Sequence, residues 1–281
     1  MKKKAFRPKK RFGQNFLHDP AIANKIVDAA GLSPERPVIE LGPGKGFLTK
    51  PLAGRGARLI AIEVDDDLHA ELVRYFEALD PPPVGTVEIL HEDFTRVSIT
   101  AILAERGFDG CVLMGNIPYN RTRDVLFSFL VDENEMIDAA YLMVQREVGE
   151  RIVSPPGSRV YGITSVILQS LYDVRSVFRV APGSFVPRPK VGSVVLEFKK
   201  LESPLVGAGE LKSFQSLVKN LFQQRRKTIH KTLKAFYSLS EAELDRVRER
   251  AGIDLDKRPE ALDKIQFLGL SRVISDLTVL E

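Results

Sequence analysis

The chain has 281 residues, of which 44% are hydrophobic and 28% are charged, a composition typical of a globular protein long enough for two domains. No apolar stretch approaches the roughly 20 residues of a membrane-spanning helix, and the basic N-terminus lacks the apolar core of a secretory signal, so neither is expected. A single cysteine, Cys111, excludes a disulfide framework and a multi-cysteine zinc site and fits a reducing compartment.

Positive charge is concentrated in two short segments. The net charge is only +4, yet residues 1–11 carry seven Lys or Arg, residues 219–234 carry six, and neither segment contains an acid. The rest of the chain is therefore net negative. Such segments are typical of proteins that bind nucleic acid, although a solvated tail and one solvated helix face would give the same pattern.

The first two thirds of the chain alternate between helical and strand-like segments. Asp19 and Pro20 predict a helix start, and Gly31 its end. Further helical periodicity is found at Leu68–Leu79, Arg121–Leu130 and Thr164–Leu171. Seven short runs read as strands: Val38–Leu41, Arg58–Glu63, Thr86–Leu90, Gly110–Met114, Ala139–Val144, Ser176–Val180 and Ser193–Phe198. Apolar strands alternating with helices predict an α/β fold with a mostly parallel seven-stranded sheet covered on both faces.

The pattern changes after Lys200. Residues 203–209 read as a linker, and no later segment resembles a strand. The amphipathic segments that follow are Leu211–Phe222, Thr228–Phe236, Glu241–Ala251 and Ala261–Leu280, the last expected to be split in two. We therefore expect two domains: an α/β domain over residues 1–202 and a small all-α domain over 203–281.

A glycine-rich loop follows the first predicted strand. Residues Glu40 to Gly46 read E-L-G-P-G-K-G, and glycines at Gly42 and Gly44 allow a sharp turn and the close approach of a ligand. Phe47 stands where a dinucleotide fingerprint would have its third glycine, and the spacing does not match a phosphate-binding P-loop. The loop indicates a nucleotide-like ligand, while a simple tight turn remains the alternative.

Acidic residues follow the next two strands. Glu63 ends the second strand, about 20 residues after Gly42, where a carboxylate can accept both hydroxyls of a ribose. Asp93 follows the third strand and can accept from the exocyclic amine of adenine. Either acid alone could be a helix cap. Together with the glycine loop, and without an arginine pair or P-loop lysine, they favour an adenosine that carries no phosphate, such as S-adenosylmethionine.

The fourth strand ends in the segment Asn116-Ile117-Pro118-Tyr119. The Asn116 side-chain oxygen and the Ile117 carbonyl could accept from the two N–H groups of an adenine N6 amine, which would favour a pyramidal nitrogen with a free lone pair. Pro118 would fix the backbone so that these acceptors converge, and Tyr119 would stack on the base. Methyl transfer would then depend on positioning and electrostatics. A polar turn with a buried tyrosine is the alternative.

Weaker signals lie elsewhere in the chain. In the segment before the last strand, Phe185 could cover the second face of the base, or be a lid on the core, and Arg188 and Lys190 could reach phosphates. Cys111 reads as inert core. His69, His91 and His230 have no ligand spacing, so no metal is expected.

With these residues in view, the sequence resembles the KsgA-type ribosomal RNA adenine dimethyltransferases. The matching strings are Gly13-Gln14-Asn15-Phe16-Leu17, Glu40-Leu41-Gly42-Pro43-Gly44, Glu63-Val64-Asp65, Asn116-Ile117-Pro118-Tyr119-Asn120, Phe185-Val186-Pro187-Arg188-Pro189-Lys190-Val191, Leu221-Phe222-Gln223-Gln224-Arg225-Arg226-Lys227-Thr228 and Arg258-Pro259-Glu260. The likeness runs from about residue 9 to near the C-terminus.

The resemblance implies a Rossmann-like class I methyltransferase sheet with a small helical domain. It also implies dimethylation of N6 of two adjacent adenosines in the 3′-terminal hairpin loop of small-subunit (16S) ribosomal RNA, with S-adenosylmethionine as the donor. The family's Gln-Asn-Phe-Leu segment would give Asn15 and Leu17 a cofactor-binding role, beside Gly42, Glu63, Asp93 and Asn116. Its helical domain would place Arg225, Arg226 and Lys227 on RNA. Ile117 departs from the usual leucine without expected consequence.

Two positions and several functions stay open. The roles of His18 and Lys45 are not assigned; Lys45 could meet the cofactor carboxylate or point to solvent. One alternative is an erythromycin-resistance type methylase acting on large-subunit (23S) RNA, which the Gln-Gln-Arg-Arg-Lys-Thr helix disfavours. The others are a DNA adenine methylase, an NAD-dependent oxidoreductase and a non-catalytic ribosome assembly factor. We expect a monomer that acts on an assembling 30S particle. Because the short leader before Gly13 leaves no room for a typical organelle-targeting peptide, we expect the compartment to be a bacterial cytoplasm.

Overall fold

The computed structural model describes residues 15–278. Its contacts divide the chain into two compact units, one made of the residues up to Gly149 together with Arg175–Lys199, the other of Glu150–Val174 and the residues from Lys200 onward. The domain boundary expected after residue 202 lies close to Lys200, where the chain enters the second unit for the last time. Residues 150–174 group with the C-terminal helices because helix α7 (Ile163–Leu171) packs against two of them, α8 and α11.

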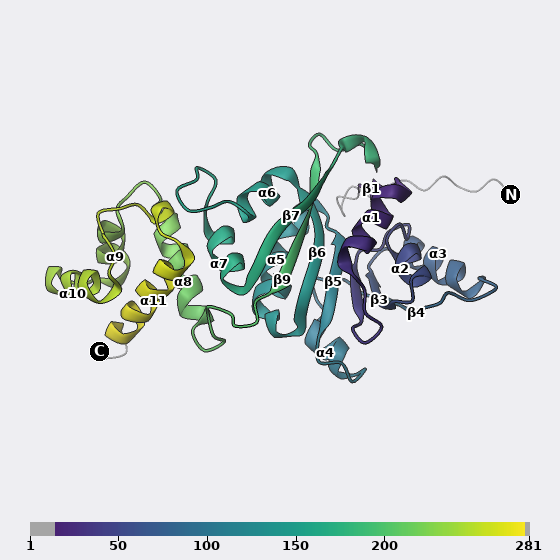
Figure 1. The fold of residues 1–281 in the computed structure, drawn as a ribbon, viewed down its shortest axis with the longest axis horizontal. Helices are drawn as coiled ribbons and strands as arrows, with labels where there is room; N and C mark the ends of the chain where they lie inside the picture. Colours follow the sequence, from purple (N-terminus) through teal and green to yellow (C-terminus); the bar gives the residue numbers. More distant parts are fainter. Residues whose placement is uncertain (1–14, 279–281) are drawn as a thin grey trace. The chain divides into compact units, whose positions relative to one another are not determined.

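A seven-stranded sheet organises the first unit (Figure 1). Its strand order is β4-β3-β2-β5-β6-β9-β7. The strands are β2 (Val38–Leu41), β3 (Arg58–Glu63), β4 (Thr86–His91), β5 (Cys111–Asn116), β6 (Ile137–Gln145), β7 (Tyr172–Val180) and β9 (Ser193–Lys200). β2 to β6 pair in parallel, whereas β9 runs antiparallel to β6. The seven strands expected from the sequence are confirmed.

Helices of the first unit pack on this sheet and set the positions of its loops. They are α1 (Pro20–Ala30), α2 (Thr49–Gly54), α3 (Asp66–Glu77), α4 (Ile99–Ala104), α5 (Thr122–Phe127) and α6 (Arg146–Ile152), the last of which runs into the second unit. The expected caps of α1 are present: Asp19 accepts from the Ala21 N–H at 3.0 Å, and Gly31 has φ +53°. Ile26 and Val27 of α1 are buried against the sheet, each contributing roughly 1.5–3 kcal/mol. α5 is shorter than expected because a π turn (Ser128–Asp132) follows Phe127.

A second, two-stranded sheet was not expected from the sequence. β1 (Phe16–Leu17) pairs antiparallel with β8 (Phe185–Val186), Leu17 opposite Phe185. The pairing continues at His18, whose N–H donates to the Ser184 carbonyl at 3.0 Å and whose ring Nε2 lies 3.0 Å from the Gly183 carbonyl. The segment after Gln14 is thereby held against the loop that precedes β9.

The second unit is helical. Besides α7 it contains α8 (Leu211–Gln223), α9 (Ile229–Tyr237), α10 (Glu241–Ala251) and α11 (Lys264–Thr278) (Figure 1). The sequence predicted two helices from residue 261 onward. The described part of this segment forms one helix, α11, which a 3₁₀ turn at Pro259–Ala261 precedes. Residues 279–281 and the basic segment 1–11 lie outside the described residues. Within residues 15–278, no helix combines the length and apolar character that crossing a membrane requires.

Candidate active site

A cavity opens at the carboxyl ends of β2, β3, β4 and β5. Its empty volume is about 730 Å³, open mouth included. Nine of its lining residues were expected from the sequence: Asn15, Gly42, Gly44, Glu63, Asp93, Asn116, Ile117, Pro118 and Tyr119. Four more, Phe16, Val64, Phe94 and Arg121, were not. Phe16, Val64 and Phe94 each directly follow an expected residue, and Arg121 lies two residues after Tyr119, so proximity in sequence was the available signal.

The glycine loop forms one wall of the cavity. The Gly42 N–H donates to the Ile62 carbonyl at 3.0 Å, and Gly44 has φ +58°. A Cβ at Gly44 would lie 3.0 Å from Cε1 of Phe16. A side chain at this position would therefore be strained and crowded, whereas glycine leaves the peptide open to a ligand.

Glu63 connects the end of β3 to this loop. Its Oε2 accepts from the Gly44 N–H at 2.9 Å, and its Oε1 accepts from the Asp65 N–H at 2.9 Å. Burial raises the pKa of the Glu63 carboxyl, which the two backbone donors counteract. The helix cap considered for Glu63 is supplied instead by Asp65, which accepts from the Asp67 N–H at the start of α3. Glu63 keeps lone pairs that could accept ribose hydroxyls.

Asp93 lies in the loop after β4. Its Oδ1 accepts from both the N–H and the hydroxyl of Thr95, at 2.9 and 2.8 Å. Partial burial acts to raise the pKa of Asp93, but these hydrogen bonds and the nearby charges of Arg121 and Arg96 outweigh it and lower the pKa. Because both bonds end on Oδ1, an ionised Oδ2 can accept from an amine in the cavity.

The loop after β5 carries a hydrogen bond that orients Asn116. The Asn116 Nδ2 donates to the main-chain carbonyl of Asn15 at 2.8 Å. Since the amide nitrogen is committed to Asn15, the amide oxygen is the group that can accept from a ligand in the cavity. The next peptide is also fixed, because the Ile117 N–H donates to the Met143 carbonyl at 3.1 Å.

Tyr119 is held by a residue that sequence reasoning missed. The Tyr119 hydroxyl lies 3.0 Å from the hydroxyl of Ser193, the first residue of β9. Ser193 is buried, whereas the Tyr119 ring is half-buried and lines the cavity. The sequence signal was a hydroxyl at the start of a strand that continues with three apolar residues.

Two expected site residues lie elsewhere. Leu17 and Phe185 are 3% and 2% exposed and belong to the hydrophobic cluster beneath β1 and β8. Their side chains do not line the cavity. In this geometry the Phe185 side chain packs in the core, as in the alternative considered for it.

Glu40, at the foot of the glycine loop, was not assigned a role from the sequence. Its side chain is 2% exposed and its Oε2 has no hydrogen-bond partner among the described residues. Burial raises the pKa of Glu40 to about 8, with a further contribution from the negative charge of Glu63. Glu40 thus retains its proton at neutral pH.

Two histidines separated in sequence come together beside α3. The rings of His69 and His91 stack at 4.7 Å, and His91 Nε2 lies 2.9 Å from Asp66. In the part of the chain that the structure describes, no group of three or more His, Cys, Asp or Glu could hold a metal ion.

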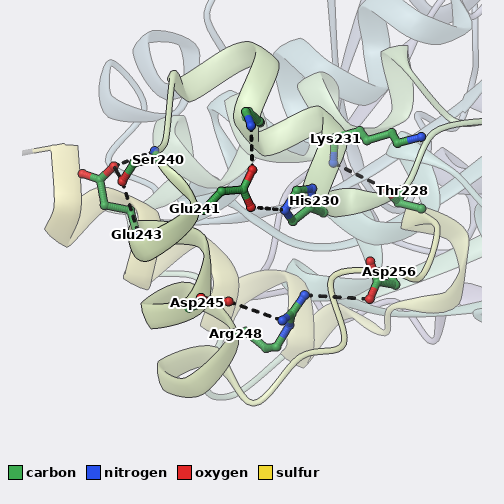
Figure 2. A network of polar contacts seen from close by, with 10 residues as sticks. Thr228, His230, Lys231, Ser240, Glu241, Glu243, Asp245, Arg248 and Asp256 are labelled. Carbon is green, nitrogen blue, oxygen red and sulfur yellow. Dashed lines mark hydrogen bonds and ion pairs between the residues drawn. The ribbon is translucent and has the colours of Figure 1, made fainter.

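In the helical unit, acidic residues neutralise part of the basic segment 219–234. Glu241 binds both Lys234 and His230, at 2.6 and 2.9 Å (Figure 2). Arg225 is half-buried, 3.4 Å from the Ser158 carbonyl and 3.7 Å from Glu260.

Other cations of that segment remain on the surface. Arg226 and Lys227 are exposed and form no ion pair with residues 15–278. Figure 2 shows the Lys231 side chain extending away from Glu241. In the first unit, Arg188 and Lys190 are likewise exposed in the loop between β8 and β9.

Comparison with known proteins decides the family. Residues 5–276 match the family described as ribosomal RNA adenine dimethylase. The chain belongs to this family. Among relatives of this dimethylase, "Ribosomal RNA small subunit methyltransferase A" of Geobacter metallireducens is 40% identical, over 99% of both chains. The protein of the same name from Syntrophotalea carbinolica is 41% identical, over 95% of this chain and 97% of its own.

Solved structures resemble the dimethylase in fold. A dimethyladenosine transferase from Plasmodium falciparum has a TM-score of 0.75 at 25% identity, covering 91% of this chain and 95% of that one. The 23S rRNA methyltransferase ErmE has a TM-score of 0.69 at 24% identity, covering 93% and 100%. The likeness to ErmE is one of fold alone.

Proposed function

We propose that this dimethylase converts two adjacent adenosines, in the hairpin loop near the 3′ end of small-subunit ribosomal RNA, to N6,N6-dimethyladenosine. The relatives named as small-subunit methyltransferases support this RNA rather than the large-subunit one. The observation that carries the proposal is the oriented Asn116 amide in one cavity with Glu63, Asp93 and Tyr119.

The cavity suits S-adenosylmethionine as the methyl donor. Glu63 would bind the ribose and Asp93 the adenine amine, while Gly42 and Gly44 leave room beside the main chain. Arg121, which contributes the single guanidinium among the described residues of the lining, lies 3.3 Å from Asp124, so these residues offer little to a phosphorylated ligand. When bound, S-adenosylmethionine supplies an electrophilic methyl group.

The chain's own residues would prepare the target amine. Asn116 Oδ1 and the Ile117 carbonyl accept from its two N–H groups, which favours a pyramidal nitrogen whose lone pair is free. Tyr119 stacks on the base, worth about 1–3 kcal/mol, and Pro118 sets the turn between them with φ −54° and ψ 130°. The amine gives one proton to solvent for each methyl group it gains, so no strong base is required.

The same proposal includes the setting of the reaction. We propose that a monomer acts in the cytoplasm on an assembling 30S particle, with Arg226 and Lys227 on phosphates of the particle and Arg188 and Lys190 on the target strand. The exposure of these four cations supports this.

The test is incubation with labelled S-adenosylmethionine and under-methylated small subunits, followed by nucleoside analysis of the RNA. Labelled N6,N6-dimethyladenosine in the 3′-terminal hairpin is the expected product. Label in large-subunit RNA only, or no label in RNA, would refute the proposal.

A further inference from the structure

A second cavity lies on the other side of the glycine loop. It is formed by the first turns of α1 and the segment leading into α2, and its empty volume is about 500 Å³, open mouth included. We call it the lysine groove and define it by Pro20, Ala23 and Asn24 on one side and Lys45, Phe47 and Lys50 on the other. Among residues 15–278, none of those that line it is acidic.

The glycine loop separates the lysine groove from the active site. Gly44 lines the active-site cavity, whereas Lys45 and Gly46 line the groove. This wall is packed tightly, because a Cβ at Gly46 would lie 2.7 Å from Cδ2 of Leu72. Consecutive residues of this loop, Gly44 and Lys45, thus line the active-site cavity and the groove.

The groove combines apolar surface with positive charge. Lys45 Nζ lies 5.4 Å from the centre of the Phe16 ring, and Lys50 Nζ lies 4.0 Å from the centre of the Tyr75 ring. Both lysines are exposed. Contact with an aromatic face orients an ammonium group and leaves N–H donors for an anion. Phe47 is half-buried and, with Pro20 and Ala23, supplies apolar contact area.

We propose that the lysine groove binds a nucleotide of the RNA strand next to the target adenosine, with Lys45 and Lys50 on its phosphates and the apolar surface on its base or ribose. This rests on the proposed function, because an RNA loop whose adenosine enters the active site must continue across the neighbouring surface. An unpaired nucleotide is the ligand that presents phosphate and an apolar face together. Lys45, to which the sequence analysis assigned no role, thereby has a role outside the cofactor site.

The experiment compares the double variant Lys45→Gln/Lys50→Gln with Lys25→Gln. Lys25 is an exposed lysine of α1 that lies 4.3 Å from the Phe178 ring and outside the groove, so its variant shows the effect of losing one charge on the neighbouring surface. Binding of a synthetic hairpin with two adjacent loop adenosines is measured over a range of salt concentrations. Binding of S-adenosylmethionine is measured separately by calorimetry.

For the double variant we expect RNA affinity to fall about tenfold at 0.1 M salt, and the slope of log affinity against log salt to fall by about 1.4–1.8. Lys25→Gln should retain most of the affinity and slope, and cofactor affinity should be unchanged in both. An unchanged slope, or a loss of cofactor affinity instead of RNA affinity, would overturn the proposal.

Two further results separate this proposal from its rivals. If polyglutamate of equal charge competes with the hairpin as well as an oligonucleotide does, and the competition depends on Lys45 and Lys50, the groove takes an acidic peptide and the proposal is wrong. The assignment of the groove depends only on the binding measurements and not on methyl-transfer activity. A wild-type protein that binds the hairpin through these lysines but methylates no small-subunit RNA would refute the proposed function and leave the groove assignment standing.

Discussion

The active-site cavity and the helical unit present polar groups in opposite ways. In the cavity, Asn116, Glu63 and Asp93 follow successive strands, and backbone groups 2.8–2.9 Å away orient each of them. In the helical unit, the basic side chains of residues 225–234 lie on α9 or in the turn between α8 and α9, and Lys234 and His230 pair with the exposed side chain of Glu241 (Figure 2). Parallel strands bring their carboxyl ends together whatever the loops contain, whereas helix faces allow many charge pairings. The cavity therefore depends on the fixed geometry of its polar groups, and the helical unit on its surface charge.

The largest effect is expected for Asn116→Ala. Losing a preorganised acceptor should lower kcat by about 10²–10³-fold, while cofactor affinity largely survives because Glu63, Asp93 and the glycine loop remain. Single-turnover methylation and calorimetric titration of the cofactor measure the two effects. Retained turnover would show that the amide is not the acceptor.

Glu40→Gln should change the pH dependence of stability. The folded-state pKa of about 8 lies above the ordinary value of 4.5, so between these values the folded protein holds a proton that the unfolded chain releases. Stability is therefore lost as pH rises through this window, by up to about 1.4 kcal/mol per pH unit. Urea unfolding at pH 6 and pH 8 should show a loss on the order of 2 kcal/mol that Glu40→Gln lacks.

The matched control is Glu88→Gln. The hydrogen bond from Arg106 lowers the pKa of Glu88, so that carboxyl is ionised at both pH values and its loss should not change the difference between them. Equal pH dependence in wild type and Glu40→Gln would mean that Glu40 is ionised in the folded protein.

Glu63→Ala should weaken cofactor binding by about 10–100-fold, because both the ribose acceptor and the support of the Gly44 N–H are lost. Glu63→Gln retains one acceptor oxygen and should lose less. An unaltered calorimetric titration for Glu63→Ala would remove its assignment to the ribose.

The helical unit is tested by charge rather than geometry. Arg226→Glu/Lys227→Glu should weaken binding to the small subunit and lower the salt slope, by about 0.7–0.9 for each phosphate that the variant no longer neutralises. Arg225→Gln should instead lower thermal stability, since Arg225 is held by Glu260 and the Ser158 carbonyl. A fall of about 0.7–0.9 in the salt slope for Arg225→Gln would place Arg225 on the RNA as well.

The same contrast explains how much could be predicted from the sequence. The seven strands and nine lining residues were predictable, because strand-end motifs occupy neighbouring positions in any parallel sheet. The pairing of β1 with β8 was not, since two-residue strands show no alternation and their partners lie far apart in the chain. Burial of Phe185 followed from that missed pairing. Ion pairs such as Arg225 with Glu260 depend on tertiary geometry that charge counts do not contain.

The smallest effect concerns Ser193, which we infer to be a positioning residue for Tyr119. Ser193→Ala and Tyr119→Phe each remove one hydroxyl of the same 3.0 Å pair and keep the stacking ring. A hydrogen bond contributes about 0.5–1.5 kcal/mol, so each variant should lower kcat/KM for RNA about 2- to 10-fold with cofactor affinity unchanged. Because the hydroxyls act through each other, the double variant should be no worse than either single one, and Ser193→Thr should restore activity. A purely structural role would instead lower the melting temperature without changing kcat/KM at a temperature where all variants are folded. Additive losses would show that the two hydroxyls act separately, and the ring of Tyr119 would then be positioned by its packing alone.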